Sequence, residues 1–317
     1  MVWCLIPTAC PAWNASHLDL AAVKIVLAGG SGALGRSLAA DLTAHGHQIV
    51  VLSRRPSPGT LLWDGRTAGD WAPELRGSVL INLAGEIVDR PPTPANVELL
   101  TRSRVEPTRA LAEAAAAHPP ALWLQLSTLA LYGDAGEPVL DESAKPADGP
   151  PQMAGVAGAW ERAARGAPCD RQVILRTAVV FEPGTPALQR LVSLTRWGLG
   201  GRVGSGRQWV SWLHIADFLA AVRFLIDARD LSGVVHLTSP HPVRNAELMA
   251  TFRRVLGRPP SPPTPELLVK LGARVLRTDP ALGLTGRRCV PGRLLEAGFE
   301  FRHPRLEEAL RDLLTRG

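Results

Sequence analysis

The stretch that decides the fold is "VKIVLAGGSGALGRSLAADL", residues 23–42. An apolar run at 23–28, suited to a strand covered on both faces, leads directly into glycines, and helical spacing follows over 33–45. Glycine lets the backbone turn tightly and approach a phosphate group, while the start of a helix offers unpaired N–H groups and the positive end of its dipole. The spacing G-x-x-G-x-x-G in this setting therefore predicts a dinucleotide-binding turn.

The rest of the chain repeats this alternation of strand and helix patterns. Apolar or β-branched runs that suit buried strands occur at 23–28, 48–53, 78–84, 121–127, 172–180 and 234–239, with a shorter edge strand at 60–63. Helical spacing separates them at 33–45, 95–117, 153–165 and 214–228. Strands that alternate with helices build crossover units, so we expect an α/β fold with a doubly wound parallel sheet.

A change of texture after residue 180 predicts a second, smaller lobe. Glycine and tryptophan are frequent over 197–212, and the chain from 241 onward is helical and punctuated by proline. We expect a nucleotide-binding core and a mostly helical, substrate-side lobe. Their predicted bounds are 23–181 plus 212–240 for the core and 182–211 plus 241–317 for the lobe.

Residues 1–22 precede the first predicted strand. They contain neither Lys nor Arg, and Pro7 and Pro11 interrupt their apolar residues, so they fit neither a secretory signal nor a mitochondrial presequence. We expect a poorly ordered extension, with an unusual targeting peptide as the open alternative.

Composition excludes several classes of protein. The 317 residues carry a formal net charge of +6, but the basic residues are scattered and form no cluster of the kind that binds nucleic acid. No apolar run reaches the roughly 18 residues that a membrane span needs. The four cysteines have no zinc-site spacing, which predicts no metal and a reducing compartment. We expect a soluble protein of the cytoplasm or another reducing compartment, with a mitochondrial location left open, that acts on a small molecule. The sequence specifies neither that substrate nor the oligomeric state.

The end of the second predicted strand selects the dinucleotide. An Asp or Glu there would accept hydrogen bonds from the adenosine ribose and repel a 2′-phosphate, whereas this chain has Ser53, Arg54 and Arg55. Guanidinium groups pair well with phosphate oxygens. NADP(H) is therefore the expected cofactor, and two solvent-facing arginines at a strand exit are the alternative interpretation.

Five further motifs resemble one family. They are "NLAGE" (82–86), "SRVEPTRALAEA" (103–114), "VGSGRQWVSWLHIADF" (203–218), "NAELMATFRRVLGRP" (245–259) and "RLLEAGFEFRHPRLEEALRDLL" (293–314). Together they are similar to the epimerase-like atypical short-chain dehydrogenase/reductases, the family of 39U member 1 and its bacterial relatives. The resemblance extends from about residue 23 to the C-terminus.

This resemblance implies an extended-type Rossmann fold that binds NADP(H). It implies that the pyrophosphate faces the glycine turn and the 2′-phosphate the end of the second strand, with further contacts after later strands and on one helix. The residues so implied are Gly29, Gly30, Ser31, Gly32, Ala33, Leu34, Gly35, Ser53, Arg54, Leu83, Ala84, Arg104 and Val180. Leu83 and Ala84 also follow a strand end, where such sheets bind ligands. For Arg104, a surface arginine on a helix is the alternative.

The catalytic pair usual in this superfamily, Tyr-x-x-x-Lys, is absent. Tyr132 is the only tyrosine, and Gly136 stands where the lysine would follow it. By spacing, the helix that would carry the pair has Met153 and Ala157 at the two positions, and neither side chain exchanges a proton.

The candidates that are left for acid–base work are few. Ser127 could polarise a carbonyl and Tyr132 could supply a proton, although a packing role is the alternative for Tyr132. Glu86 could act as a base if desolvated, with a solvated loop carboxylate as the other reading. His214 stands at a helix start, where capping is expected.

The sequence therefore supports an NADP(H)-dependent oxidoreductase of the epimerase-like type, with an unknown substrate and uncertain activity. The alternative is a non-catalytic NADPH-binding or sensing module that acts through a protein partner. A sugar-nucleotide epimerase is a third hypothesis, but it needs proton transfer twice and the groups for it are missing.

Overall fold

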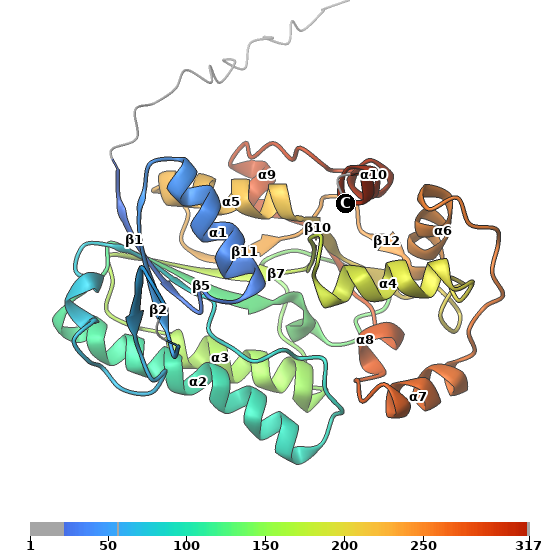
Figure 1. Cartoon of the computed structure of the whole chain (residues 1–317), viewed down its shortest axis with the longest axis horizontal. Helices are drawn as coiled ribbons and strands as arrows, with labels where there is room; N and C mark the ends of the chain where they lie inside the picture. The colour runs from blue at the N-terminus through green and yellow to red at the C-terminus, as the bar shows by residue number, and fades with distance from the viewer. Residues whose placement is uncertain (1–21, 56, 316–317) are drawn as a thin grey trace, which may run out of the picture.

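The centre of the protein is a seven-stranded parallel sheet with the order β11-β7-β5-β4-β1-β2-β3 (Figure 1). The structure, a computed structural model, describes residues 22–55 and 57–315. The strands are β1 (Lys24–Ala28), β2 (Gln48–Ser53), β3 (Thr60–Leu62), β4 (Val79–Asn82), β5 (Leu122–Thr128), β7 (Arg171–Thr177) and β11 (Gly233–Leu237). Because the strand order changes direction between β1 and β4, the sheet is doubly wound, as predicted.

Helices cover both faces of this sheet. Helices α1 (Ala33–Ala44) and α5 (Ile215–Asp227) lie on one face, and α2 (Pro94–Ala117) and α3 (Val156–Ala164) on the other (Figure 1). Side chains of β1 alternate between the two: Leu27 packs with α1 and α5, whereas Val26 packs with α2. Burial on both faces explains why the strand sequences are apolar throughout.

Most strand predictions agree with the structure within one or two residues, and two boundaries were wrong. The run 172–180 is not one strand, because β7 ends at Thr177 and β8 (Val179–Phe181) pairs instead with β10 (Trp212–His214). The helix expected over 153–165 begins as a π-helical turn, η3 (Pro151–Gly155), before α3.

The C-terminal half adds helices and short strands beyond the sheet. They are α4 (Pro186–Arg196), β9 (Trp209–Val210), β12 (Val243–Arg244), α6 (Asn245–Val255), α7 (Glu266–Val275), α8 (Ala281–Leu284), β13 (Arg288–Cys289), α9 (Gly292–Glu296) and α10 (Leu306–Thr315). Phe181, Trp212 and Phe252 are at the centre of the apolar cluster that α4, α6 and α10 share. Leu294 and Phe299 pack instead into the cluster of the large sheet. The division into core and lobe stays a prediction.

Three short elements before α3 complete the fold. They are η1 (Ala72–Leu75), η2 (Leu129–Tyr132) and β6 (Val139–Leu140), which pairs in parallel with β13. No helix among the described residues is both long and apolar enough to cross a membrane. The extension predicted over 1–22 lies, apart from its last residue, outside the described residues.

Candidate functional site

The turn between β1 and α1 is packed backbone against backbone. Gly29 has φ +84°, and a Cβ there would stand 2.8 Å from the carbonyl carbon of Leu83 and 2.9 Å from the nitrogen of Ala84. A Cβ at Gly35 would stand 2.6 Å from the Cα of Gly30. These distances are shorter than any real Cβ contact, so the protein's own packing requires glycine at both positions.

Gly32 differs from these glycines because the protein leaves space around it. The nearest atom to a Cβ at Gly32 would be Gly29 O at 3.4 Å, and its φ of −71° and ψ of 174° suit any residue. Gly32 is the N-cap of α1, and no side chain caps the helix there. The start of α1 therefore has N–H groups without a side-chain cap, and such a helix start can accept an anionic group.

The rest of this turn consists of Ser31, Ala33 and Leu34. Ser31 is exposed, and its carbonyl oxygen accepts a hydrogen bond from Arg36 Nη1 at 2.7 Å. Ala33 starts α1 and is exposed, whereas Leu34 packs partly against the main apolar cluster. The turn thus presents backbone and small side chains at its surface.

The exit of β2 carries cations and no acid. Ser53 is 6% exposed, and its Oγ accepts a hydrogen bond from the backbone N–H of Arg55 at 3.1 Å. The Arg54 side chain is 72% exposed, and its Nη2 lies 3.4 Å from Oε1 of Glu86. Arg55 is exposed. Guanidinium groups suit the 2′-phosphate of NADP(H), whereas the ribose hydroxyl of NAD(H) is usually bound by an acid at this point.

The loop after β4 lies directly beside the glycine turn. Leu83 N–H donates to Ala28 O at 2.8 Å, and Ala84 N–H donates to Asn82 Oδ1 at 3.1 Å. Leu83 and Ala84 therefore lie at the end of β1, against Gly29, and their contact with the cofactor stays a prediction. Val180, on β8, packs partly against the same apolar cluster as Leu83.

Arg104 is a buried cation, so its alternative reading as a surface arginine is wrong. It is 9% exposed, its Nη2 donates to Glu86 O at 2.8 Å, and its guanidinium lies 5.1 Å from the centroid of the Trp160 ring. Burial lowers the pKa of Arg104 to about 10. This guanidinium fixes the backbone of the loop after β4.

Ser127 belongs to a buried polar network that the sequence did not reveal. Its hydroxyl donates to Glu161 Oε1 at 2.6 Å, and Arg176 donates to both oxygens of Glu161, at 2.9 and 2.8 Å. Glu161 and Arg176 have side chains only 6% and 7% exposed. Ser127 lies opposite Arg176 in the register of β5 and β7, which brings the three side chains together.

Tyr132 closes the same network on its other side. Its oxygen accepts a hydrogen bond from Arg176 Nη1 at 2.7 Å and lies 2.7 Å from His236 Nε2. Because His236 Nδ1 faces the carbonyl oxygen of Val290 at 3.0 Å, the ring proton is on Nδ1, and Tyr132 donates to Nε2. Burial raises the pKa of Tyr132 to about 12 and lowers that of His236 to about 4.

The two positions of the missing pair lie on the helix that carries Glu161. Met153 is in the π-helical turn η3, and Ala157 is 2% exposed on α3. Glu161 follows one helical turn after Ala157, so these two side chains lie on the same face of α3. The four-residue spacing from Ala157 was the one signal in the sequence that could have pointed to Glu161. Its partners Ser127 and Arg176 lie on β5 and β7, far from it in the sequence.

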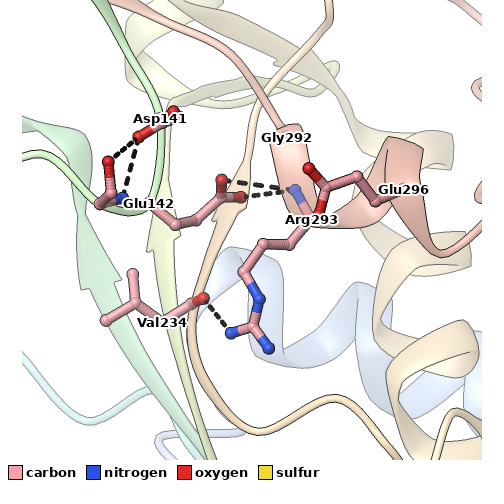
Figure 2. A pocket seen from close by; sticks show the side chains of 7 residues that line it. Asp141, Glu142, Val234, Gly292, Arg293 and Glu296 are labelled. Atoms are coloured by element: carbon pink, nitrogen blue, oxygen red, sulfur yellow. Dashed lines mark hydrogen bonds between the residues drawn. The ribbon is translucent and has the colours of Figure 1, made fainter.

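A cavity of about 440 Å³ opens beside β11, four strands from β1 in the sheet. Figure 2 shows its lining, in which Glu142 faces the start of α9 and Arg293 reaches back to β11. Glu142 accepts hydrogen bonds from the N–H groups of Arg293 and His236, and Arg293 Nη1 donates to Val234 O at 2.7 Å. These groups hold α9 against the sheet, and the predicted cofactor residues are not among the lining.

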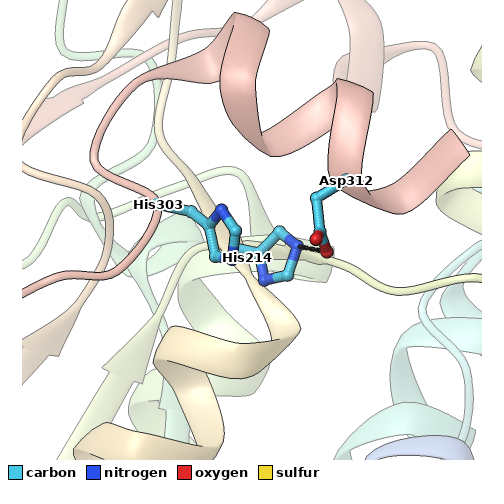
Figure 3. A group of neighbouring side chains, drawn as sticks. All are labelled: His214, His303 and Asp312. Atoms are coloured by element: carbon cyan, nitrogen blue, oxygen red, sulfur yellow. Dashed lines mark ion pairs between the residues drawn. The ribbon is translucent and has the colours of Figure 1, made fainter. Parts of the chain in front are cut away.

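His214, His303 and Asp312 form a cluster with metal-ligand chemistry (Figure 3). His214 Nδ1 accepts the N–H of Ala216 at 3.0 Å, which confirms the predicted cap of α5. The ring proton is therefore on Nε2, 3.3 Å from Asp312 Oδ2, and the His303 ring stacks at 3.9 Å. This tautomer leaves His214 no free lone pair for a metal, so the cluster is better explained as a link between α5 and α10.

The chain is similar to epimerase family proteins over most of its length. The model of the NAD dependent epimerase/dehydratase family matches residues 25–236, and a domain of unknown function matches residues 264–313. An epimerase family protein of Mycobacterium bovis is 35% identical over 94% of this chain and 99% of its own length. The epimerase family protein SDR39U1 of Homo sapiens is 32% identical, over 92% of this chain and 100% of its own.

Solved structures agree with these relatives. The crystal structure of human SDR39U1 (isoform 2) with NADPH matches with a TM-score of 0.82 at 30% identity, covering 93% of this chain and 100% of that one. A nucleoside-diphosphate sugar epimerase from Corynebacterium glutamicum matches with a TM-score of 0.75 at 28% identity, covering 92% of this chain and 58% of that one.

The difference between the glycines predicts that alanine destabilises the protein much more at Gly35 than at Gly32. Gly35→Ala should lower the free energy of unfolding by more than about 2 kcal/mol, because the new Cβ meets backbone that cannot move aside. Gly32→Ala should lower it by less than about 1 kcal/mol, since its conformation and surroundings accept a methyl group. Urea denaturation of both variants measures this; equal losses would refute the distinction.

The buried network predicts a loss of stability in acid. His236 has a folded-state pKa of about 4, below the 6.5 of the unfolded chain, so the unfolded state binds more protons between these values. Its contribution is present above pH 6.5 and should fall by about 2 kcal/mol between pH 7 and pH 5. Denaturant unfolding at both pH values measures the loss. His236→Gln should have a correspondingly smaller pH dependence, and an unchanged one would contradict this assignment.

Proposed function

This chain belongs to the NAD dependent epimerase/dehydratase family and, within it, to the epimerase family proteins related to SDR39U1; on that premise we propose that it binds NADP(H) at the turn between β1 and α1. The observation that carries the proposal is the start of α1 at Gly32, which no side chain caps and where a Cβ would come no closer than 3.4 Å to Gly29 O. The NADPH in the solved structure of the human relative supports the same choice of cofactor.

The preference for NADP(H) over NAD(H) follows from the exit of β2. The exposed guanidinium of Arg54 would pair with a 2′-phosphate, with Ser53 and Arg55 beside it. Leu83, Ala84 and the loop fixed by Arg104 would border the rest of the dinucleotide. Val180 completes the set as a prediction from family resemblance.

We propose further that the chain is an oxidoreductase, with hydride transfer to a small carbonyl compound as its reaction type. Bound NADPH would supply the hydride. Ser127 and Tyr132 stay predictions as catalytic residues. Each would first have to leave a present hydrogen bond, Ser127 that to Glu161 and Tyr132 that to His236. Turnover without a positioned acid would forgo the 10²–10⁴-fold that such catalysis typically supplies.

A second candidate function is favoured by that same network. With Met153 and Ala157 at the positions of the pair, and with Ser127 and Tyr132 both engaged, the chain would serve as an NADPH-binding module that acts through a partner protein. Screening small carbonyl compounds with NADPH separates the two: turnover that Ser127→Ala abolishes supports the enzyme. Full NADPH binding without any turnover supports the module.

Titration of the full chain with NADPH and NADH, by calorimetry or nucleotide fluorescence, tests the cofactor site. We expect the wild type to prefer NADPH. Gly32→Ala should weaken both nucleotides by about tenfold or more, because the methyl group occupies the space of the pyrophosphate. Arg54→Gln should weaken NADPH by about tenfold and NADH by less than about twofold. A wild type that binds neither nucleotide, or both equally, would refute the assignment.

A further inference from the structure

We propose that Glu86 is a specificity-determining residue, whose carboxylate competes with the 2′-phosphate of the cofactor for Arg54. Glu86 thereby limits how strongly the chain prefers NADP(H) over NAD(H). The inference rests on the proposed function, since it concerns the same cofactor site.

The contact between Arg54 and Glu86 joins the loops on either side of β1. Arg54 follows β2 and Glu86 lies in the loop after β4, and these two strands flank β1 in the sheet. The 3.4 Å between Arg54 Nη2 and Glu86 Oε1 therefore spans the end of β1, where the glycine turn begins. Glu86, from the loop after β4, thus pairs with Arg54, the guanidinium that is expected to bind the 2′-phosphate.

The backbone of Glu86 is fixed while its carboxylate is shared. Its N–H donates to Ser103 Oγ at 3.1 Å, and its carbonyl oxygen accepts from Arg104 Nη2 at 2.8 Å. The second carboxylate oxygen, Oε2, lies 3.2 Å from Arg90 Nη2. When Arg54 turns to a phosphate, the carboxylate keeps Arg90 as its partner, so the exchange leaves no charge unpaired.

The negative charge of Glu86 should weaken the binding of NADP(H), which carries the 2′-phosphate, and leave that of NAD(H) nearly unchanged. The Arg54 side chain is 72% exposed and its pair with Glu86 is long, so the arginine is easily released. A phosphate that bound there would carry nearly two negative charges close to the carboxylate, and like charges at such distances repel. NAD(H) has a hydroxyl at this point and meets no such repulsion.

The test is a comparison of Glu86→Gln with a matched control, Glu74→Gln. Glu74 pairs with Lys24 at 3.1 Å at the opposite end of β1, and its side chain is 38% exposed against 31% for Glu86. Both variants remove one negative charge. In titrations of the full chain, Glu86→Gln should raise the affinity for NADPH by about threefold to tenfold and that for NADH by less than about twofold. Glu74→Gln should change neither.

Arg90→Met supplies a change in the opposite direction. Without Arg90 the carboxylate rests on Arg54 alone, so the affinity for NADPH should fall. In the double variant with Glu86→Gln that fall should disappear. A wild type that prefers NADPH, with Glu86→Gln equal to Glu74→Gln and no effect of Arg90→Met, would overturn this inference and leave the proposed function intact. A wild type without preference for NADPH, whose Glu86→Gln variant gains none, would overturn both.

Discussion

The buried ion pair between Glu161 and Arg176 is the interaction on which the centre of the molecule depends. It ties α3 to β7 and holds Ser127 of β5 and Tyr132 of η2 through the hydrogen bonds that remain. Removing one partner would leave the other charge buried and unpaired, which typically costs 3–5 kcal/mol. The pair also fixes the helix face on which the superfamily's catalytic residues would stand. The network thus holds Ser127 and Tyr132 firmly, and their catalytic role stays a prediction.

Much of the architecture could be predicted, because buried parallel strands and amphipathic helices leave strong local patterns. The strand at 48–53 and the edge strand near 60 were found from these patterns alone. Two-residue strands such as β6 and β13 have too few residues to show any period, and the π-helical turn η3 has no local signal. Their formation depends on tertiary contacts that the sequence pattern does not contain.

In the candidate site, too, some features could be predicted from the sequence and others could not. The glycine turn and the cations after β2 could be predicted because each lies within one short segment. The network around Arg176 could not, since Tyr132 and His236 are separated by 104 positions and it is the pairing of β7 with β11 that places His236 opposite Arg176. Arg104 is similar, because its burial depends on the loop that folds over it. Family resemblance pointed to Arg104 where physical reasoning on the sequence favoured an exposed side chain.

The unequal packing of the glycines has a consequence for how such motifs are used in surveys of genomes. Neighbouring backbone atoms exclude any side chain at Gly29 and Gly35, whereas the protein itself places no such constraint on Gly32. A descendant that had lost its nucleotide would still be under selection to keep the first and last of these glycines, and only the middle one would drift. The glycine signature would then outlive the binding that it is taken to indicate. A side chain at the middle position would then distinguish a relative that has kept only the fold of the turn from one that still binds the nucleotide.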